Sequence, residues 1–344
     1  MKQKSGDCLK NIKLFFLTLM FLLLSGLLLT YPLESLTFSL TGLQLWFNKM
    51  IPALLPFMIL SGMMVRLNLT EYFAKILSPA LTPLLRIRLN GIYAIVIGFL
   101  CGFPMGAKTI AELYSCGKLT RKEASFLLSF CNNIGPVYFI SFVLPTLELR
   151  RKAPYLFGMY GLPLLYGIFL RYTLYKKELD ALYPARYASQ TGFLTGKNRL
   201  SAAECDPAQA KRPASLLDTL DDAILSGLYS ISKLGGYMIL FNLLNLAPEI
   251  LLHSVPAAKT DSAGLINCLL EITSGISRVG NSAPLAVLLL LPFGGFSCIA
   301  QTYSMIKETD LSLQGYILHK LVLSLVTAAY YGLFALLFPS SFLL

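Results

Sequence analysis

Long apolar segments alternate along the chain with short polar ones, and several reach the length of about 20 residues that a helix needs to cross the hydrocarbon core of a bilayer. These segments predict membrane-spanning helices at 14–30, 40–65, 91–113, 124–144, 153–174, 218–246, 283–305 and 315–338. The pattern therefore predicts an all-α fold, a polytopic bundle of transmembrane helices.

Two further apolar segments, 72–85 and 264–276, are too short to cross as straight helices. Pro79 and Pro83 interrupt the first of them, so we expect either a short tilted half-span or part of a re-entrant hairpin. The span at 40–65 holds two prolines four residues apart, which predicts a kinked or broken helix.

The composition agrees with a membrane location. Of the 344 residues, 55% are apolar and 14% are charged, whereas charged residues make up about a quarter of a typical soluble domain. The net charge of +11 does not indicate nucleic-acid binding, because the Lys and Arg residues stand in short clusters between apolar segments. Such clusters are the pattern that orients helices in a bilayer. We expect the lipid bilayer as partner and no nucleic acid.

The N-terminal segment has features of a cleaved signal peptide, because four lysines precede its apolar run. No small-x-small cleavage site follows, and Tyr31-Pro32-Leu33-Glu34 stands in its place. We therefore expect an uncleaved first span within an N-terminal unit at 1–39.

A change of composition divides the rest of the chain. Residues 176–215 are polar and rich in Gly, Pro, Ala, Lys and Arg, which predicts a solvated linker. This linker separates a first membrane repeat with its connecting span, at 40–175, from a second membrane repeat at 216–344.

The two halves share one order of elements: a long span, a short interrupted segment, a Gly-rich span and another span. Residues 102–109 and 295–302 also match at four of eight positions. If the N-terminus and the linker are cytoplasmic and ten segments cross, most Lys and Arg residues of the loops lie inside, as expected. The repeats are then inverted, as in many secondary transporters, whose sites form from broken helices; hairpins in place of the short spans are the alternative.

One stretch carries the strongest functional signal. Gly102, Pro104 and Gly106 weaken helical hydrogen bonding there, and Lys108 and Glu112 bring charges to one helix face. In a bilayer, freed backbone groups and charges require protein or a water-filled cavity around them. The stretch predicts a polar site near the middle of the membrane, and a purely structural Lys108–Glu112 pair is the alternative.

Asn132, Asn133 and Pro136 repeat this combination on the next predicted span. The two amides could contact a heterocycle or an amide group of a solute. They could equally form hydrogen bonds between helices, which is a common use of Asn in membrane bundles.

In the second half, Glu271 and Arg278 lie seven residues apart on one helix face. A desolvated carboxylate can take up a proton, so Glu271 is a candidate for a proton-coupled step, unless Arg278 simply pairs with it. Gln301 is a further polar candidate. Three other polar residues are weaker candidates: Lys233, Asn242 and Asn245.

The sequence does not indicate common catalytic chemistry. The motif at 102–109 is similar to a phosphate-binding loop, but only three residues separate its glycines and Ala precedes its lysine. The two histidines, His253 and His319, suit no Ser-His-Asp arrangement, and the seven cysteines have no metal-ligand spacing. We therefore expect no enzyme, no metal site and no cofactor.

Four motifs together resemble a known family. GFPMGAK at 102–108, FCNN with its following proline at 130–136, LEITSGI at 270–276 and PFGGFS at 292–297 resemble sporulation integral membrane proteins within the nucleoside-recognition (Gate) domain superfamily. The resemblance covers about 46–338. The motif positions that it carries over are Gly102, Phe103, Pro104, Gly106, Lys108, Asn132, Asn133, Pro136, Glu271, Gly275, Gly294, Gly295 and Gln301.

The resemblance implies a multi-pass protein of endospore-forming bacteria, located in the mother-cell membrane or the outer forespore membrane and required for a complete spore envelope. It also implies kinship with nucleoside transporters and with the gate domains of iron-uptake proteins. The name of the domain does not by itself identify a nucleoside ligand.

Two hypotheses of function follow. The first is a transporter-like carrier of a small polar solute, nucleoside-like or other, which binds between the two repeats at the motif positions and Glu112. The second is a non-transporting scaffold that organises assembly of the spore cortex or coat through partner proteins. The scaffold predicts that Lys108→Ala, Asn132→Ala and Glu271→Gln leave sporulation intact, whereas changes in the linker abolish it.

Overall fold

The computed structural model describes residues 15, 18, 19, 21–149, 152–182, 215–253 and 260–338, and in this part of the chain all regular structure is helical. The helices of the first half are α2 (Pro32–Leu45), α3 (Ile51–Arg66), α4 (Thr70–Lys75), α5 (Ser78–Leu85), α6 (Leu89–Cys101), α7 (Met105–Ser115), α8 (Arg121–Leu128), α9 (Pro136–Tyr138), α10 (Leu144–Thr146), α11 (Lys152–Leu156), α12 (Leu162–Tyr172) and α13 (Lys176–Leu182). Those of the second half are α14 (Leu216–Leu244), α15 (Leu246–His253), α16 (Thr260–Leu270), α17 (Ile272–Val279), α18 (Pro284–Leu290), α19 (Gly295–Ile306) and α20 (Leu313–Leu337). The predicted all-α bundle is confirmed.

Five helices of the described residues are long and apolar enough to cross a membrane: Pro32–Arg66, Lys152–Tyr172, Leu216–Leu251, Pro284–Ile306 and Leu313–Leu337. They agree with five predicted spans. The bent pair α5 and α6, with an angle of 107°, would make a sixth. The first predicted span, at 14–30, is described only in part, where Phe21–Thr30 forms a short apolar helix.

The predicted kink in the span at 40–65 is a widened helical turn. Helices α2 and α3 join through the π-helical turn Trp46–Met50 into one helix of 35 residues. In this turn the N–H of Ile51 donates to the carbonyl of Trp46, five residues back. The extra residue falls just before Pro52, which has no N–H to donate, so the helix is distorted but not broken.

Two predicted spans are wrong in shape. The segment at 91–113 is not one span, because α6 ends at Cys101 and the chain reverses at Gly102, so that α7 packs back against α6. We call α6–α7 the first hairpin. The segment at 124–144 is unwound between α8 and α9. Helix breakers stand at both places in the sequence, but only packing decides whether a break becomes a reversal.

Helices α16 and α17 form a second hairpin around Glu271. A Cβ on Gly264 would lie 2.7 Å from a methyl of Val279, and one on Gly275 would lie 2.6 Å from Sγ of Cys268. The two helices therefore pack side by side and antiparallel, with the tip of the hairpin at Glu271. The short segment predicted at 264–276 thus belongs to a hairpin, which was the alternative to a half-span.

The structure repeats an order of elements, although not the one that the sequence match suggested. Each hairpin is followed by an interrupted helix and then by a long one: α8–α10 and α11–α12 in the first half, α18–α19 and α20 in the second. This order pairs the first hairpin with the second hairpin, whereas the match of 102–109 with 295–302 pairs it with α19. Inversion of the two repeats stays a prediction.

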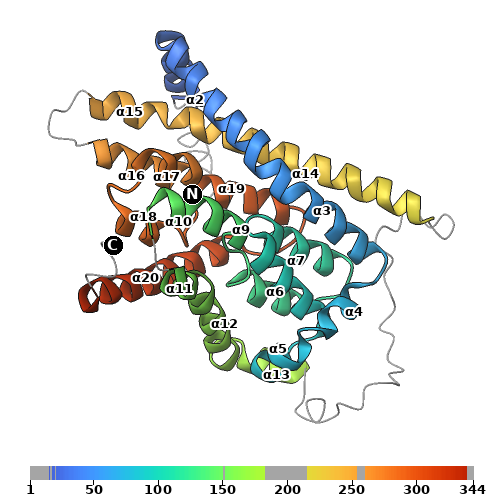
Figure 1. The fold of residues 1–344 in the computed structure, drawn as a ribbon. Helices are drawn as coiled ribbons and strands as arrows, with labels where there is room; N and C mark the ends of the chain where they lie inside the picture. The colour runs from blue at the N-terminus through green and yellow to red at the C-terminus, as the bar shows by residue number, and fades with distance from the viewer. Residues whose placement is uncertain are drawn as a thin grey trace, which may run out of the picture.

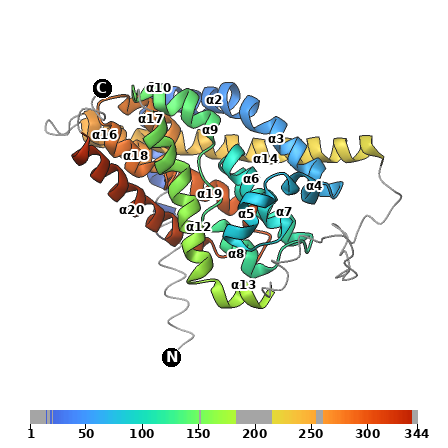
Figure 2. The same cartoon turned by 60° about the horizontal axis from the view of Figure 1, so that its bottom comes forward.

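The interrupted helices lie at the centre and the long ones outside. Helix α14 runs beside α2 and α3, α7 packs against α19, and α12 packs against α20 (Figures 1 and 2). Nε1 of Trp46 donates to the carbonyl of Ile231 at 2.8 Å and so fixes α14 to the first long helix. The most apolar part of Pro284–Ile306 is 67% buried, compared with 22% for Leu313–Leu337, so most of the outer helix is exposed at the periphery.

Capping boxes begin α8 and α14. Thr120 caps α8 in a reciprocal arrangement with Glu123, and Ser215 caps α14 in the same way with Asp218. The first residues of the predicted linker belong to the fold: α13 is helical, and its Leu179 is fully buried. The rest of the linker, 183–214, lies outside the described residues, and the other domain boundaries stay predictions.

Candidate functional site

The first hairpin packs directly on the unwound segment between α8 and α9. Gly102, at the tip, has a φ of +82°, and a Cβ there would clash with the backbone of Gly135. A Cβ on Gly106 would lie 2.8 Å from the carbonyl oxygen of Cys131. Side chains at these two positions would therefore push the hairpin away from the unwound segment.

Asn132 connects three elements in the protein interior. Its Oδ1 accepts from the backbone N–H of Ala107 at 3.3 Å, and its Nδ2 donates to Oγ1 of Thr302 at 2.9 Å and to the hydroxyl of Tyr316 at 3.1 Å. Asn132 is fully buried. The geometry favours the second of its two interpretations, a hydrogen-bonding junction between helices.

Asn133 holds a buried lysine that the sequence analysis missed. Nζ of Lys320 donates to Oδ1 of Asn133 at 2.9 Å and lies over the rings of Phe103 and Tyr316, 4.7 and 5.7 Å from their centres. The Lys320 side chain is fully buried. The signal was a single lysine inside the last apolar segment, which is costly in a bilayer and therefore marks a functional or structural polar contact.

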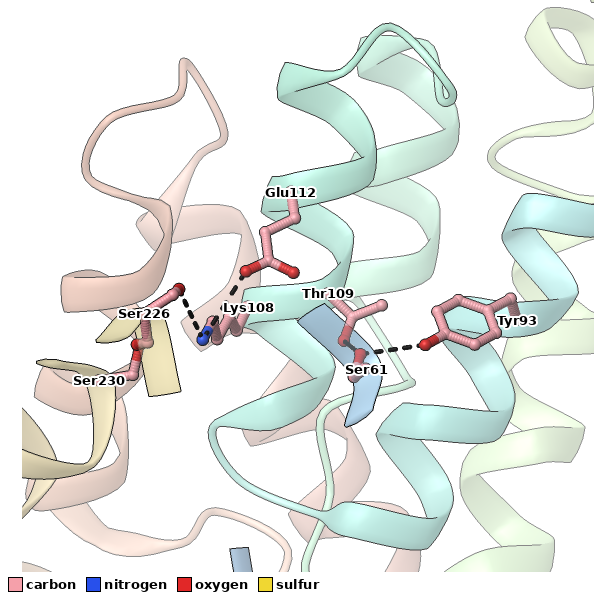
Figure 3. Close-up of polar contacts among 7 residues, drawn as sticks. All are labelled: Ser61, Tyr93, Lys108, Thr109, Glu112, Ser226 and Ser230. Carbon is pink, nitrogen blue, oxygen red and sulfur yellow. Dashed lines mark hydrogen bonds and ion pairs between the residues drawn. The ribbon is translucent and has the colours of Figure 1, made fainter. Parts of the chain in front are cut away.

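Lys108 and Glu112 form the predicted pair on α7. Nζ of Lys108 lies 3.7 Å from Oε1 of Glu112 and donates to Oγ of Ser226 on α14 at 3.4 Å (Figure 3). Lys108 is 6% exposed. On another side of α7, Oγ1 of Thr109 lies 3.4 Å from Oγ of Ser61, which accepts from the Tyr93 hydroxyl (Figure 3). Polar contacts on two sides thus anchor α7.

Glu271 stands at the tip of the second hairpin, between the end of α16 and the start of α17. Its carboxylate accepts from the N–H groups of Thr273 at 3.2 Å and Ser274 at 2.7 Å, which caps α17. The alternative, in which Arg278 pairs with Glu271, is not found in the described part of the chain, where Arg278 pairs with Glu249 at 2.7 Å. Glu271 is therefore a buried carboxylate held by a helix N-terminus.

A cavity of about 80 Å³ lies where the two hairpin tips meet the two interrupted helices. The residues from these four elements that line it include Phe103, Gly135, Glu271, Thr273, Gly294 and Gln301. Apolar side chains of the outer long helices, such as Leu54 and Met238, close another side. A Cβ on Gly294, where φ is +78°, would lie 3.1 Å from the ring of Phe103, so a side chain there would crowd the first tip.

The structure brings only some of the predicted residues to this cavity. The predicted residues that line the cavity are Phe103, Glu271, Gly294 and Gln301. The side-chain amide of Gln301 also donates to Oγ of Ser297 at 2.9 Å. Those that shape the backbone of the breaks are Gly102, Pro104, Gly106, Pro136, Gly275 and Gly295. Lys108, Glu112, Asn132 and Asn133 lie in or beside neighbouring polar contacts and do not line it.

The fold and the apolar helices define a multi-pass α-helical membrane protein with two hairpins at its centre. Residues 47–146, which include the first hairpin and the unwound segment, match the Gate family, described as nucleoside recognition.

The chain is also similar to the sporulation integral membrane protein YlbJ of Bacillus subtilis (strain 168). The two are 27% identical over 347 residues, which cover 94% of this chain and 83% of the relative. These matches confirm the resemblance that the four motifs indicated. No solved structure gives a significant match.

Proposed function

We propose that this protein is a transporter-like carrier of a small polar solute in spore formation, and that the cavity between the hairpin tips is its solute site. The observation that carries the proposal is the meeting of four interrupted helical elements around one cavity. Interrupted helices offer free backbone N–H and carbonyl groups, and in a membrane such groups are tolerated only where they face protein or a polar cavity.

The lining suits a solute that has both a polar and an apolar face. Glu271, Thr273 and Gln301 offer a carboxylate, a hydroxyl and an amide, whereas Leu54 and Met238 offer an apolar wall. Sites for small molecules typically combine such an apolar wall with a few convergent polar groups. In this proposal Lys108 and Asn132 do not contact the solute. They position the first hairpin through hydrogen bonds to neighbouring elements.

The biological setting comes from similarity. The relative from Bacillus subtilis is named as a sporulation integral membrane protein, which supports a role in a membrane during spore formation. The mother-cell or outer forespore membrane is the location that we propose. We also propose that the N-terminus and the linker lie in the cytoplasm, because both are rich in Lys and Arg residues.

Flux into proteoliposomes tests the proposal. The purified protein is reconstituted, and uptake of nucleosides, of dipicolinate-like acids and of divalent ions is measured. We expect flux of one class, and a loss of at least tenfold in Thr273→Val and Gln301→Leu, which change the lining. Asn48→Ala, at an exposed position of the first long helix, is the control. Folded protein with no flux of any class would contradict the carrier.

Sporulation assays separate the carrier from the scaffold. A carrier requires the residues that line its site, so Glu271→Gln and Gln301→Leu should reduce the yield of mature spores. A scaffold that binds spore-envelope assembly proteins through the linker should tolerate both changes. It should fail when residues 183–214 of the linker are replaced by an unrelated polar sequence of equal length.

A further inference from the structure

A second cavity lies between α8 and the first two turns of α20, and we call it the α8–α20 cavity. Its volume is about 270 Å³, compared with about 80 Å³ for the cavity between the hairpin tips, and the two cavities share no lining residue. A water molecule takes up about 30 Å³ in the liquid, so the α8–α20 cavity has room for several polar atoms. The proposed solute site therefore does not account for it.

The exposure of the lining residues shows how the cavity is oriented. Arg121, Lys122 and Ser312 are exposed and stand at its mouth, whereas Ser129 and Tyr316 are buried and form its floor. The cavity therefore opens where α8 and α20 begin and ends inside the protein. The half-buried residues of its wall are Ser125, Tyr175, Gly315 and His319.

The lining of the α8–α20 cavity carries positive charge and hydroxyl groups. Arg121 and Lys122 bring two cations, and among the described residues that line the cavity none is acidic. Oγ of Ser312 accepts from the N–H of Gly315 at 3.1 Å, which leaves the hydrogen of this hydroxyl to donate. A guanidinium and an ammonium form charge-assisted hydrogen bonds with phosphate oxygens. The positive ends of the α8 and α20 dipoles add to the attraction of an anion.

Both cations have acidic neighbours, but these ion pairs are weak. Arg121 contacts Asp310 through Nε at 2.9 Å and through Nη2, which donates to the main-chain carbonyl at 3.2 Å. Nζ of Lys122 lies 3.1 Å from Oε1 of Glu178. All four side chains are at least 39% exposed, so solvent screens both pairs. Neither carboxylate lines the cavity, and an anion inside it can therefore share the two cations at little cost.

We propose that the α8–α20 cavity binds a phosphate group, carried either by a small soluble molecule or by a lipid head group. Two cations and several hydroxyl groups suit an anion that presents three or four oxygens, as phosphate does, better than a carboxylate with two. Leu128 and the Tyr175 ring offer an apolar part of the wall to the organic part of the ligand. Basic sites between helices bind acidic head groups in other membrane proteins.

A ligand in this cavity connects the two halves of the chain. Helix α8 belongs to the first half and α20 to the second, and the hydroxyl of the floor residue Tyr316 accepts from Nδ2 of Asn132 at 3.1 Å. A bound phosphate group adds contacts between α8 and α20 beside this junction and should stabilise the folded protein. The site does not rest on the proposed function, because it shares no lining residue with the solute cavity.

Thermal unfolding of the detergent-purified protein tests this binding without any measurement of flux. Inorganic phosphate, AMP and short-chain phosphatidylglycerol are titrated at constant ionic strength, with chloride and acetate as comparison anions. We expect a saturable rise of Tm with inorganic phosphate and none with chloride or acetate, because a ligand that binds only the folded state stabilises it. Tighter binding of AMP identifies a soluble phosphorylated ligand, whereas tighter binding of phosphatidylglycerol identifies a lipid head group.

Gly315 allows the cavity to be filled without strain in the backbone. A Cβ there would meet nothing closer than Ser312, at 3.6 Å, and Leu favours a helix over Gly. Gly315→Leu should therefore weaken the apparent affinity for phosphate at least tenfold. Gly332→Leu on the same helix is the matched control, because nothing lies within 4 Å of its added Cβ and Gly332 does not line the cavity. Its phosphate response should equal that of the wild type.

The two cations at the mouth give a second set of variants. Arg121→Gln and Lys122→Gln should each weaken the apparent affinity at least threefold, whereas Lys307→Gln, which removes an exposed charge just before α20, should leave it unchanged. If Gly315→Leu does not fold, the charge variants decide. No saturable response to phosphate, an equal response to acetate, or an unchanged response in the cavity variants would each overturn the site. Phosphate binding without solute flux would instead contradict the proposed function and leave the site intact.

Discussion

Nδ2 of Asn132 lies 2.9 Å from Oγ1 of Thr302, and this hydrogen bond joins the unwound segment of the first half to α19 of the second. The same amide nitrogen reaches the hydroxyl of Tyr316 on α20 at 3.1 Å. In the interior of a membrane protein, polar groups must find their partners within the protein. The cavity between the hairpins therefore depends on a junction that is itself outside the cavity.

Asn132→Ala should destabilise the folded protein. The change removes the acceptor of the Ala107 N–H and the donor to Thr302 and Tyr316, all in a buried place. We expect a loss of about 1–3 kcal/mol in the free energy of unfolding, measured by denaturant titration in detergent. Asn48→Ala, at an exposed position, should change it by no more than about 0.5 kcal/mol. Equal losses in the two variants would contradict the junction.

Gly102→Ala should disrupt the contact between the first hairpin and the unwound segment. Gly102 has a φ of +82°, and an added Cβ would meet the backbone of Gly135, which cannot move aside as a flexible side chain can. We expect a Tm at least several degrees lower, because strain and overpacking together cost about 2–5 kcal/mol.

The matched control for that change is Gly236→Ala on α14. Nothing lies within 4 Å of the Cβ that it would add, and Ala favours a helix over Gly by about 1 kcal/mol. We expect an unchanged or higher Tm. A Tm of Gly102→Ala equal to that of the wild type would show that the hairpin does not pack as described.

The sequence predicted the kind of fold and the places where helices break. Apolar length gave the long helices, because the bilayer fixes that length. Gly102 and Pro136 marked two breaks, since residues of these types release backbone hydrogen bonds wherever they stand. The capping box at Thr120 is a local feature of the same kind, because its two hydrogen bonds join residues three positions apart.

Long-range packing decided the rest. A break at Gly102 is compatible with a kink or with a reversal, and the partner that distinguishes them, Gly135, lies 33 positions away in the sequence. Arg278 has the right spacing to reach Glu271 on an ideal helix, but Glu271 stands at the start of α17, and Glu249 of another helix is the residue that meets Arg278. Lys320 was overlooked because its partner, Asn133, lies in the other half.

Lys108 and Glu112 should show energetic coupling in a double-mutant cycle. The two charges are 3.7 Å apart, and the Lys108 side chain is 8% exposed. Lys108→Met leaves Glu112 without its cation, and Glu112→Gln leaves the Lys108 ammonium without its anion. The stability losses of the two single variants should therefore add up to more than the loss of the double variant. We expect a coupling energy of about 1–3 kcal/mol from unfolding measurements. Additive effects would show that the pair contributes nothing.

Asp180→Asn should give a stability loss that depends on pH. Nη2 of Arg171 donates to Oδ1 of Asp180 at 2.7 Å, and this hydrogen bond lowers the pKa of Asp180 below its usual 3.8. A lowered carboxyl pKa stabilises the folded state above the pKa of the unfolded chain and ceases to do so as the pH falls through the native pKa. The wild type should therefore have the higher Tm at pH 7, with the difference shrinking below about pH 4.

Glu178→Gln provides the comparison for Asp180→Asn on the same helix. Lys122 lowers the pKa of Glu178 as well, but both side chains of that pair are exposed, at 56% and 39%, whereas the Arg171 side chain is fully buried. Solvent screens an exposed pair, so its removal should cost less than about 1 kcal/mol at pH 7. Because Asp180→Asn leaves a buried guanidinium without its anion, it should cost more. Equal Tm losses, or a loss for Asp180→Asn that persists unchanged at pH 2.5, would contradict this assignment.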